Sequence, residues 1–158
     1  MTVRITKPEF NLREKLTELD YGQVPFQKMP AGSIIQVVSA YKGDSFSTSS
    51  TTFVDITGLS ATITPRFLNS KILVQCCMGA AGTSQSNNDH GNVIRTLRSI
   101  GGGSFSTENK LNGLVEGNRI AITYKGSSMS YNADHMPGGF GFVGLDDPKT
   151  TSEVVYKL

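Results

Sequence analysis

The chain has 158 residues, of which 37% are hydrophobic and 18% charged, and its formal net charge at pH 7 is +2. A chain of this length folds as one domain with a short appendix and buries an adequate core without disulfide staples, while the small, dispersed charge argues against a nucleic-acid partner. No apolar stretch is long enough to cross a bilayer and residues 1–4 lack the apolar centre of a secretion signal, so we expect a protein made in a cytoplasm, without membrane insertion.

The N-terminal segment, residues 1–22, has the pattern of one short amphipathic helix over residues 6–19. Thr6 can cap the first turn, Pro8 needs no backbone donor there, and Glu9 completes a capping box. Leu12, Leu16 and Leu19 share one face and form an apolar ridge, and together with Phe10 they are the expected anchor residues. A helix this short is marginal in water unless it packs against something. We expect the ridge to dock on another protein subunit; packing on its own body is the alternative.

Residues 23–32 are predicted to be an extended linker, and residues 33–158 a separate head. Pro25 and Pro30 exclude a helix in the linker and restrict the residues before them. From residue 33 the apolar pattern changes to a period of two. Residues 33–41 are apolar on both faces, which predicts a central strand.

The head has the pattern of an all-β domain. Residues 45–56 are rich in hydroxyls and β-branched side chains and predict an edge strand, and in residues 59–64 Leu59, Ala61 and Ile63 share one face. Further strands are predicted at residues 71–78, 92–100, 119–125, 139–145 and 153–158, the last with Val154, Tyr156 and Leu158 on one face. Many short strands without a helix predict an antiparallel β-sandwich. We expect a jelly-roll-like head, although periodicity leaves the strand order, and so the choice between a jelly roll and another sandwich, open. Cys76 and Cys77 then point to opposite faces as two reduced thiols.

Two groups of residues resemble known sequences. The head residues that carry the likeness are 44–48, 51–59 (including Phe53-Val54-Asp55-Ile56-Thr57-Gly58-Leu59), 62–65, 70–74, 145–148 and 151–157. They resemble a β domain of tail-fibre and other virion proteins of marine bacteriophages. Residues 4–15, Arg4-Ile5-Thr6-Lys7-Pro8-Glu9-Phe10-Asn11-Leu12-Arg13-Glu14-Lys15, are similar to the N-terminal segment that fibre-like proteins of these phages share.

The resemblance implies a virion component. Its N-terminal helix would bind other virion proteins, and its head would face outward, often as a homotrimer. A host-surface glycan is a candidate partner of the head, and whether its loops bind a ligand stays open. Domains of this kind run on past residues 154–157 through further strands. A shortened head, a sheet completed by neighbouring subunits and further sequence all stay open.

Motifs that could carry chemistry are weak. Residues 139–144 have G-x-G-x-x-G spacing, but phenylalanine alternates with glycine and no helix pattern follows, so a strand is the better interpretation. The two Asp-His pairs, at residues 89–90 and 134–135, could in principle ligate a metal, yet Asn, Asp, Gly and His are also ordinary turn residues. No G-x-S-x-G elbow presents a serine nucleophile. We therefore expect no catalytic, cofactor or metal residues.

Arginines and loops supply the remaining candidates. Arg95 and Arg98 fall on opposite faces of a regular strand, so one of them points inward. A salt bridge within or between subunits is the expected role, and contact with an anionic surface sugar is the alternative. The loops at residues 82–91, 101–117 and 126–138 are rich in Gly, Ser and Asn, as binding loops often are. The head-surface candidates on them are Asn88, His90, Tyr131 and His135.

The sequence thus predicts a non-enzymatic structural virion protein, a short tail fibre or appendage. A capsid decoration or cement protein is the first alternative, because no coiled-coil heptads or shaft repeats are present. A glycan-cleaving spike enzyme is the second. It would need paired carboxylates facing a groove, and the adjacent Asp146 and Asp147 suit that poorly.

Overall fold

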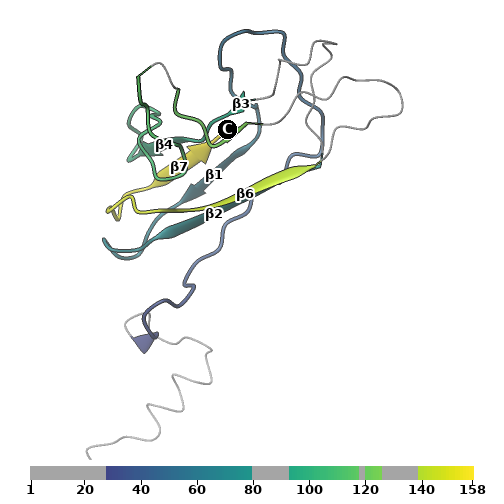
Figure 1. Ribbon diagram of the computed structural model, residues 1–158. Coiled ribbons are helices and arrows are strands. Elements are labelled where there is room, and N and C mark those ends of the chain that lie inside the picture. The colour runs from purple at the N-terminus through teal and green to yellow at the C-terminus, as the bar shows by residue number, and fades with distance from the viewer. Residues whose placement is uncertain (1–27, 80–92, 118–119, 126–138) are drawn as a thin grey trace, which may run out of the picture. The chain divides into compact units, whose positions relative to one another are not determined.

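The computed structural model describes residues 28–79, 93–117, 120–125 and 139–158, and the chain divides into two units, Met1–Val37 and Val38–Leu158. The described residues form seven strands and no α-helix, and every strand pairing is antiparallel (Figure 1). This confirms the all-β prediction at the level of fold class. The predicted helix at residues 6–19 lies outside the described residues.

The described part of the first unit contains one turn. The backbone nitrogen and the hydroxyl of Ser33 both donate to the carbonyl oxygen of Pro30, at 3.1 and 2.8 Å. Gly32 has a φ of 89°, a left-handed conformation that costs glycine little. Of the predicted linker, residues 23–32, only residues 28–32 are described.

A three-stranded sheet has the order β1-β7-β4, with β1 at Ser60–Ile63, β7 at Val154–Lys157 and β4 at Leu97–Ile100. The last strand in the sequence therefore lies between two earlier ones (Figure 1). Its register places Tyr156 opposite both Ala61 and Arg98. Val154 and Tyr156 are buried, which confirms the predicted alternation in this strand.

Two further pairs complete the strands. β2 at Ile72–Met78 pairs along its whole length with β6 at Phe140–Asp146, and β3 at Val93–Ile94 pairs with β5 at Tyr124–Lys125 (Figure 1). The G-x-G-x-x-G residues are thus a strand, as predicted. Close packing explains why residue 141 is a glycine: a Cβ on Gly141 would lie 2.8 Å from the backbone oxygen of Cys76.

The core draws on both larger sheets and on one loop. Its buried members are Ile72 of β2, Val154 and Tyr156 of β7, and Leu111 from the loop after β4. Partly buried side chains packed against them come from β1, β2 and β4: Ile63, Val74 and Ile100. Of the positions predicted to share the inward faces of residues 59–64 and 153–158, Ile63, Val154 and Tyr156 pack in this core.

The predicted central strand at residues 33–41 is wrong, and so is the edge strand at residues 45–56. Neither segment is a strand in the structure, and Tyr41 is 90% exposed. Alternating apolar residues favour an extended backbone, but a strand also needs a neighbour for its N–H and C=O groups. Ile56, whose backbone nitrogen donates to the carbonyl oxygen of Leu158 at 2.8 Å, has such a neighbour; residues 34–55 have no backbone pairing of this kind among the described residues.

The predictions in the second half are right in type but too long in two places. Of the strand predicted at residues 92–100, the described residues 93–100 form the short β3 and then β4, interrupted at Arg95 and Thr96. Of the strand predicted at residues 119–125, the described residues 120–125 contain only the β5 pair. Cys76 is partly buried and Cys77 exposed, and both are free thiols, as predicted. Burial raises the pKa of the Cys76 thiol, and its neighbour Cys77 adds to this.

Candidate functional site

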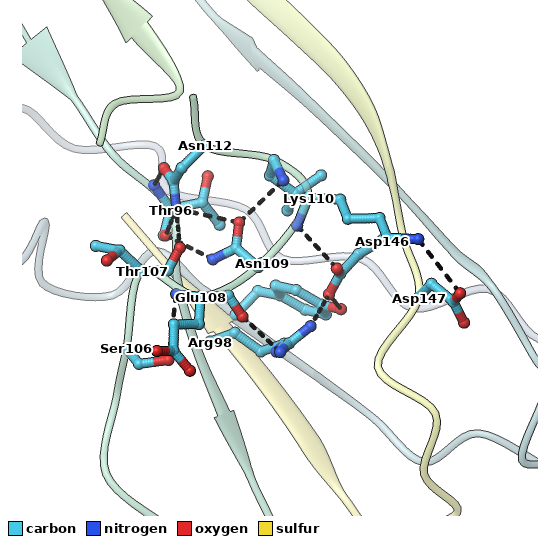
Figure 2. Close-up of polar contacts among 12 residues, drawn as sticks. Thr96, Arg98, Ser106, Thr107, Glu108, Asn109, Lys110, Asn112, Asp146 and Asp147 are labelled. Carbon is cyan, nitrogen blue, oxygen red and sulfur yellow. Dashed lines mark hydrogen bonds and ion pairs between the residues drawn. The ribbon is translucent and has the colours of Figure 1, made fainter. Parts of the chain in front are cut away.

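The most elaborate polar site in the described part of the chain is centred on Asp146, the last residue of β6. Its carboxylate is completely buried. Oδ2 accepts hydrogen bonds from the Tyr156 hydroxyl and from Arg98 Nη1, both at 2.7 Å, and Oδ1 accepts from the backbone nitrogen of Lys110 at 3.0 Å (Figure 2). Arg98 and Tyr156 are cross-strand partners on β4 and β7, which is why both reach the same carboxylate.

These contacts determine the charge state of the cluster. Burial acts to raise the pKa of Asp146, but the hydrogen bonds from Tyr156, Lys110 and Arg98, with the Arg98 charge, together hold it below its ordinary value. Burial, followed by the neighbouring carboxylate, raises the pKa of Tyr156 far above its usual range. Asp146 is therefore ionised and Tyr156 neutral around pH 7, and the carboxylate is balanced by the Arg98 guanidinium.

A second polar cluster surrounds the buried Thr96, between β3 and β4. Its backbone nitrogen donates to Asn112 Oδ1 at 3.1 Å and to Thr123 Oγ1 at 2.8 Å. Its carbonyl oxygen accepts from Asn112 Nδ2 at 2.7 Å and from Asn109 Nδ2 at 3.0 Å (Figure 2). Side chains thus replace the ladder partners of Thr96, which is why the predicted continuous strand breaks here.

The two clusters hold residues 106–112 against β4. Arg98 and Ser106 exchange two backbone hydrogen bonds of 2.9 Å, and Arg98 Nη2 donates to the carbonyl oxygen of Glu108. Asn109 accepts at Oδ1 from the backbone nitrogen of Leu111 at 3.0 Å, and the Leu111 side chain enters the core. This part of the loop at residues 101–117 is therefore a fixed structural element.

The two arginines have different roles. Arg98 forms the predicted salt bridge within the chain, to Asp146. Arg95 instead stacks its guanidinium on Phe53, with Cζ 3.9 Å from the ring centroid. Its Nε atom is buried and has no hydrogen-bond partner among the described residues.

Both carboxylates at this end of β6 are engaged by neighbouring groups. Asp146 is inaccessible and already accepts three hydrogen bonds, while Asp147 pairs with Lys110 Nζ at 3.3 Å (Figure 2). These two carboxylates do not face a common groove as a glycosidase pair would. Within residues 28–79, 93–117, 120–125 and 139–158, no group of three or more His, Cys, Asp or Glu side chains could hold a metal ion.

The site residues predicted from the sequence lie outside the described residues. This applies to the expected anchor residues Phe10, Leu12, Leu16 and Leu19, and to the head-surface candidates Asn88, His90, Tyr131 and His135. Both Asp-His pairs are also outside them. These assignments stay predictions.

Sequence reasoning missed most of the two polar clusters. Asn109, Asn112, Thr96 and Thr123 look like ordinary loop and strand residues, and nothing in their spacing indicates that they meet. One signal was present: an arginine at an inward strand position needs a carboxylate partner. That Tyr156 lies opposite Arg98 is known only from the strand register.

Comparison with known proteins identifies no family. No family model matches the chain, and no curated protein or solved structure matches it either. Within the described residues, no helix is long and apolar enough to cross a membrane.

Proposed function

We propose that the protein is a structural component of a bacteriophage virion, a short tail fibre or fibre-like appendage. In this proposal the helix at residues 6–19 attaches the chain to other virion proteins. The head is presented outward as a homotrimer that binds a host-surface glycan through its loops.

The observation that carries the proposal is where the phage-like segments lie in the fold. Residues 51–59 and 151–157, far apart in the sequence, meet at one sheet: Asp55 pairs with Lys157 Nζ at 2.6 Å, and Ile56 bonds to Leu158. β1 follows residues 51–59 directly, β7 lies within residues 151–157, and the two strands are hydrogen-bonded neighbours. The resemblance therefore follows a folded unit, which supports its being a likeness of domains rather than of scattered turns.

We further propose that the head is a jelly-roll-like sandwich of two sheets, β1-β7-β4 and β2-β6. The support is the common core, to which Val154 and Tyr156 contribute from one sheet and Ile72 from the other. Residue alternation in both sheets agrees with one inward and one outward face.

The proposed role is not enzymatic. The support is the use made of the buried polar residues: Asp146, Arg98 and Tyr156 satisfy one another, and the Thr96 cluster satisfies its own backbone. A rigid scaffold has this property, because fully satisfied polar networks specify one packing. Release of reducing sugar from host envelope by the purified protein, with clear turnover, would contradict this part of the proposal.

Locating the protein in phage particles tests the role directly. We expect copies at the tail in three-fold symmetric groups, seen by averaging of particle images with an antibody fragment bound to the protein. Hundreds of copies on the shell would instead favour the decoration or cement role, for which the lack of shaft repeats is the supporting observation. Absence from purified particles would contradict both.

A further inference from the structure

We infer that the outer face of the β2-β6 sheet is an interface between copies of this chain. This outer face consists of the six outward positions of the two strands: Leu73, Gln75, Cys77, Gly141, Val143 and Leu145. In the single chain Leu73 is 61% exposed, Val143 63% and Leu145 48%. The inference rests on this surface alone and does not depend on where the protein acts.

The outward positions form one continuous surface. In the β2-β6 register Leu73 lies opposite Leu145 and Gln75 lies opposite Val143. Cross-strand partners have Cβ atoms about 5 Å apart, so Leu73 and Leu145 are neighbours. Val143 lies on the same face of β6, two residues before Leu145. Exposed large apolar side chains that are contiguous on a protein surface often mark an interaction surface.

The other sheet does not share this property. The outward side chains of β1, Ser60 and Thr62, are polar, and Lys157 of β7 is engaged with Asp55 and with the ring of Phe105, 3.9 Å from its ammonium. On the outward side of that sheet the apolar residues Leu97 and Val155 are partly buried. Among the described strand residues, the large hydrophobic side chains that are exposed are therefore those of the outer face of β2-β6, namely Leu73, Val143 and Leu145.

The chemistry of the surface favours a second copy as its occupant. None of its six residues is an acid, a lysine, an arginine or a histidine; charge begins beyond the strand ends, at Lys71 and Asp147. A partner recognised by charge complementarity finds nothing to pair with here. Interfaces between identical subunits are the class that resembles a domain core cut in half, apolar inside with a polar rim.

The small size of the β2-β6 sheet also favours an interface between copies of this chain. Among the described residues β2 has only β6 as a neighbour, and β6 has only β2. A two-stranded ribbon gains stability when its second face is also packed, as in two sheets facing each other. A copy of the same sheet supplies a surface of matching shape and polarity.

The test uses the full chain and measures its mass in solution by light scattering at micromolar concentration. We expect an assembly for the unmodified protein and single chains for the variant Leu73→Lys/Val143→Lys, because like charges would meet at the interface. The control is Leu114→Lys, at a 91% exposed leucine in the loop after β4, which should leave the assembly intact. A double-lysine variant that still assembles would overturn the inference.

Cys77 provides a second readout that needs no substitution. It lies on the outer face, so a bulky maleimide should modify it on the order of tenfold or more slowly in the unmodified protein than in the double variant, with the adduct located by peptide mass mapping. A single-chain mass together with rapid Cys77 labelling in the unmodified protein contradicts the inference. Three chains per assembly agree with the proposed trimer, whereas two support the interface and contradict the trimer.

Discussion

A fully buried carboxylate must be compensated, and Asp146 shows how this fold does so. Moving an ion out of water costs several kcal/mol, and that cost is offset only when charge and hydrogen bonds are both satisfied. Asp146 has the Arg98 guanidinium, the Tyr156 hydroxyl and the Lys110 backbone nitrogen. Its partners come from β4, β7 and the loop after β4, so one side chain connects β6 to three other parts of the fold.

Replacing this carboxylate should destabilise the fold. We expect Asp146→Asn to lower the free energy of unfolding by about 3–5 kcal/mol, since it leaves the mostly buried Arg98 without a counter-ion. Denaturant unfolding at a fixed protein concentration measures the change. The control is Asp147→Asn, whose partner Lys110 is largely exposed, and it should cost under about 1 kcal/mol. Equal effects from the two substitutions would contradict the structural role given to Asp146.

The same group predicts an acid-sensitive fold. Its pKa is lowered in the folded chain relative to about 4 in the unfolded chain, so the unfolded state binds the proton more readily as pH falls. The stabilisation from Asp146 is therefore complete well above pH 4 and is lost as pH falls through the folded-state pKa. Unfolding free energies measured from neutral pH down to about pH 3 should fall, and the slope should be shallower in Asp146→Asn. Parallel pH profiles for the two proteins would be evidence against a contribution of Asp146 to the acid sensitivity of the fold.

Tyr156 predicts that the fold also loses stability at alkaline pH. Because its folded-state pKa is raised above about 10, its contribution is present below pH 10 and decreases as pH rises beyond that value. A Tyr156→Phe variant should lose less stability between pH 9 and about 11 than the unmodified protein, as followed by thermal unfolding. An unchanged alkaline profile in that variant would count against the buried hydrogen bond.

At the scale of elements, glycine determines how closely β2 and β6 approach. A Cβ on Gly141 would meet the Cys76 backbone oxygen at 2.8 Å, and one on Gly144 would meet Leu111 Cδ2 at 2.5 Å. A leucine terminus can rotate away, whereas a backbone oxygen in a ladder cannot move without disturbing the pairing. Gly141 is therefore the less replaceable of the two.

We expect Gly141→Ala to lower the free energy of unfolding by about 1–3 kcal/mol, as overpacking does in well-packed structures. Gly79 is the matched control, because a Cβ there would have no neighbour within 4 Å, and Gly79→Ala should change stability by less than about 0.5 kcal/mol. Denaturant midpoints of the two variants provide the comparison. A Gly141→Ala protein as stable as its control would show that the strands can separate slightly at no cost.

The strands that could be predicted from the sequence are those whose own side chains also form the core. β2 and β7 combine a clear apolar period with buried partners, and their predicted bounds differ from the observed ones by at most a few residues. Residues 33–41 are also strongly apolar but have no partner strand among the described residues, and an apolar pattern contains no information about pairing. The break at Thr96 was also unpredictable, because it depends on Asn112 and Thr123, which are distant in sequence.

The candidate site was predictable only in part, for a related reason. The need of Arg98 for an inward salt bridge follows from its own chemistry, whereas the identity of the acceptor follows from which strands are neighbours. Asp146 was considered as half of an adjacent carboxylate pair. Its fully buried position at the end of β6 could be recognised only once β6 and β7 had been placed.

At the scale of the whole molecule, the proposed attachment depends on the leucine ridge of the N-terminal segment. We expect Leu16→Asp to remove the protein from phage particles, because a carboxylate would be buried in the docking contact. The purified variant should keep the thermal unfolding transition of the head. Protein content of purified particles, compared by quantitative mass spectrometry, measures the loss.

The control for this experiment is Glu14→Asp, which places the same side chain on the opposite side of the expected helix. It should be incorporated like the unmodified protein. Normal incorporation of Leu16→Asp would contradict attachment through this ridge.

The place of β7 between β1 and β4 has a consequence for biosynthesis. Both flanking strands leave the ribosome well before residues 154–157, so the middle of this sheet is filled last. Until then β1 and β4 lack their shared neighbour β7. Pairing between strands that are far apart in the sequence, such as β1 and β7, is slow. A nascent chain interrupted ahead of Val154 cannot close the sheet, so translation has to reach that strand before the domain can mature.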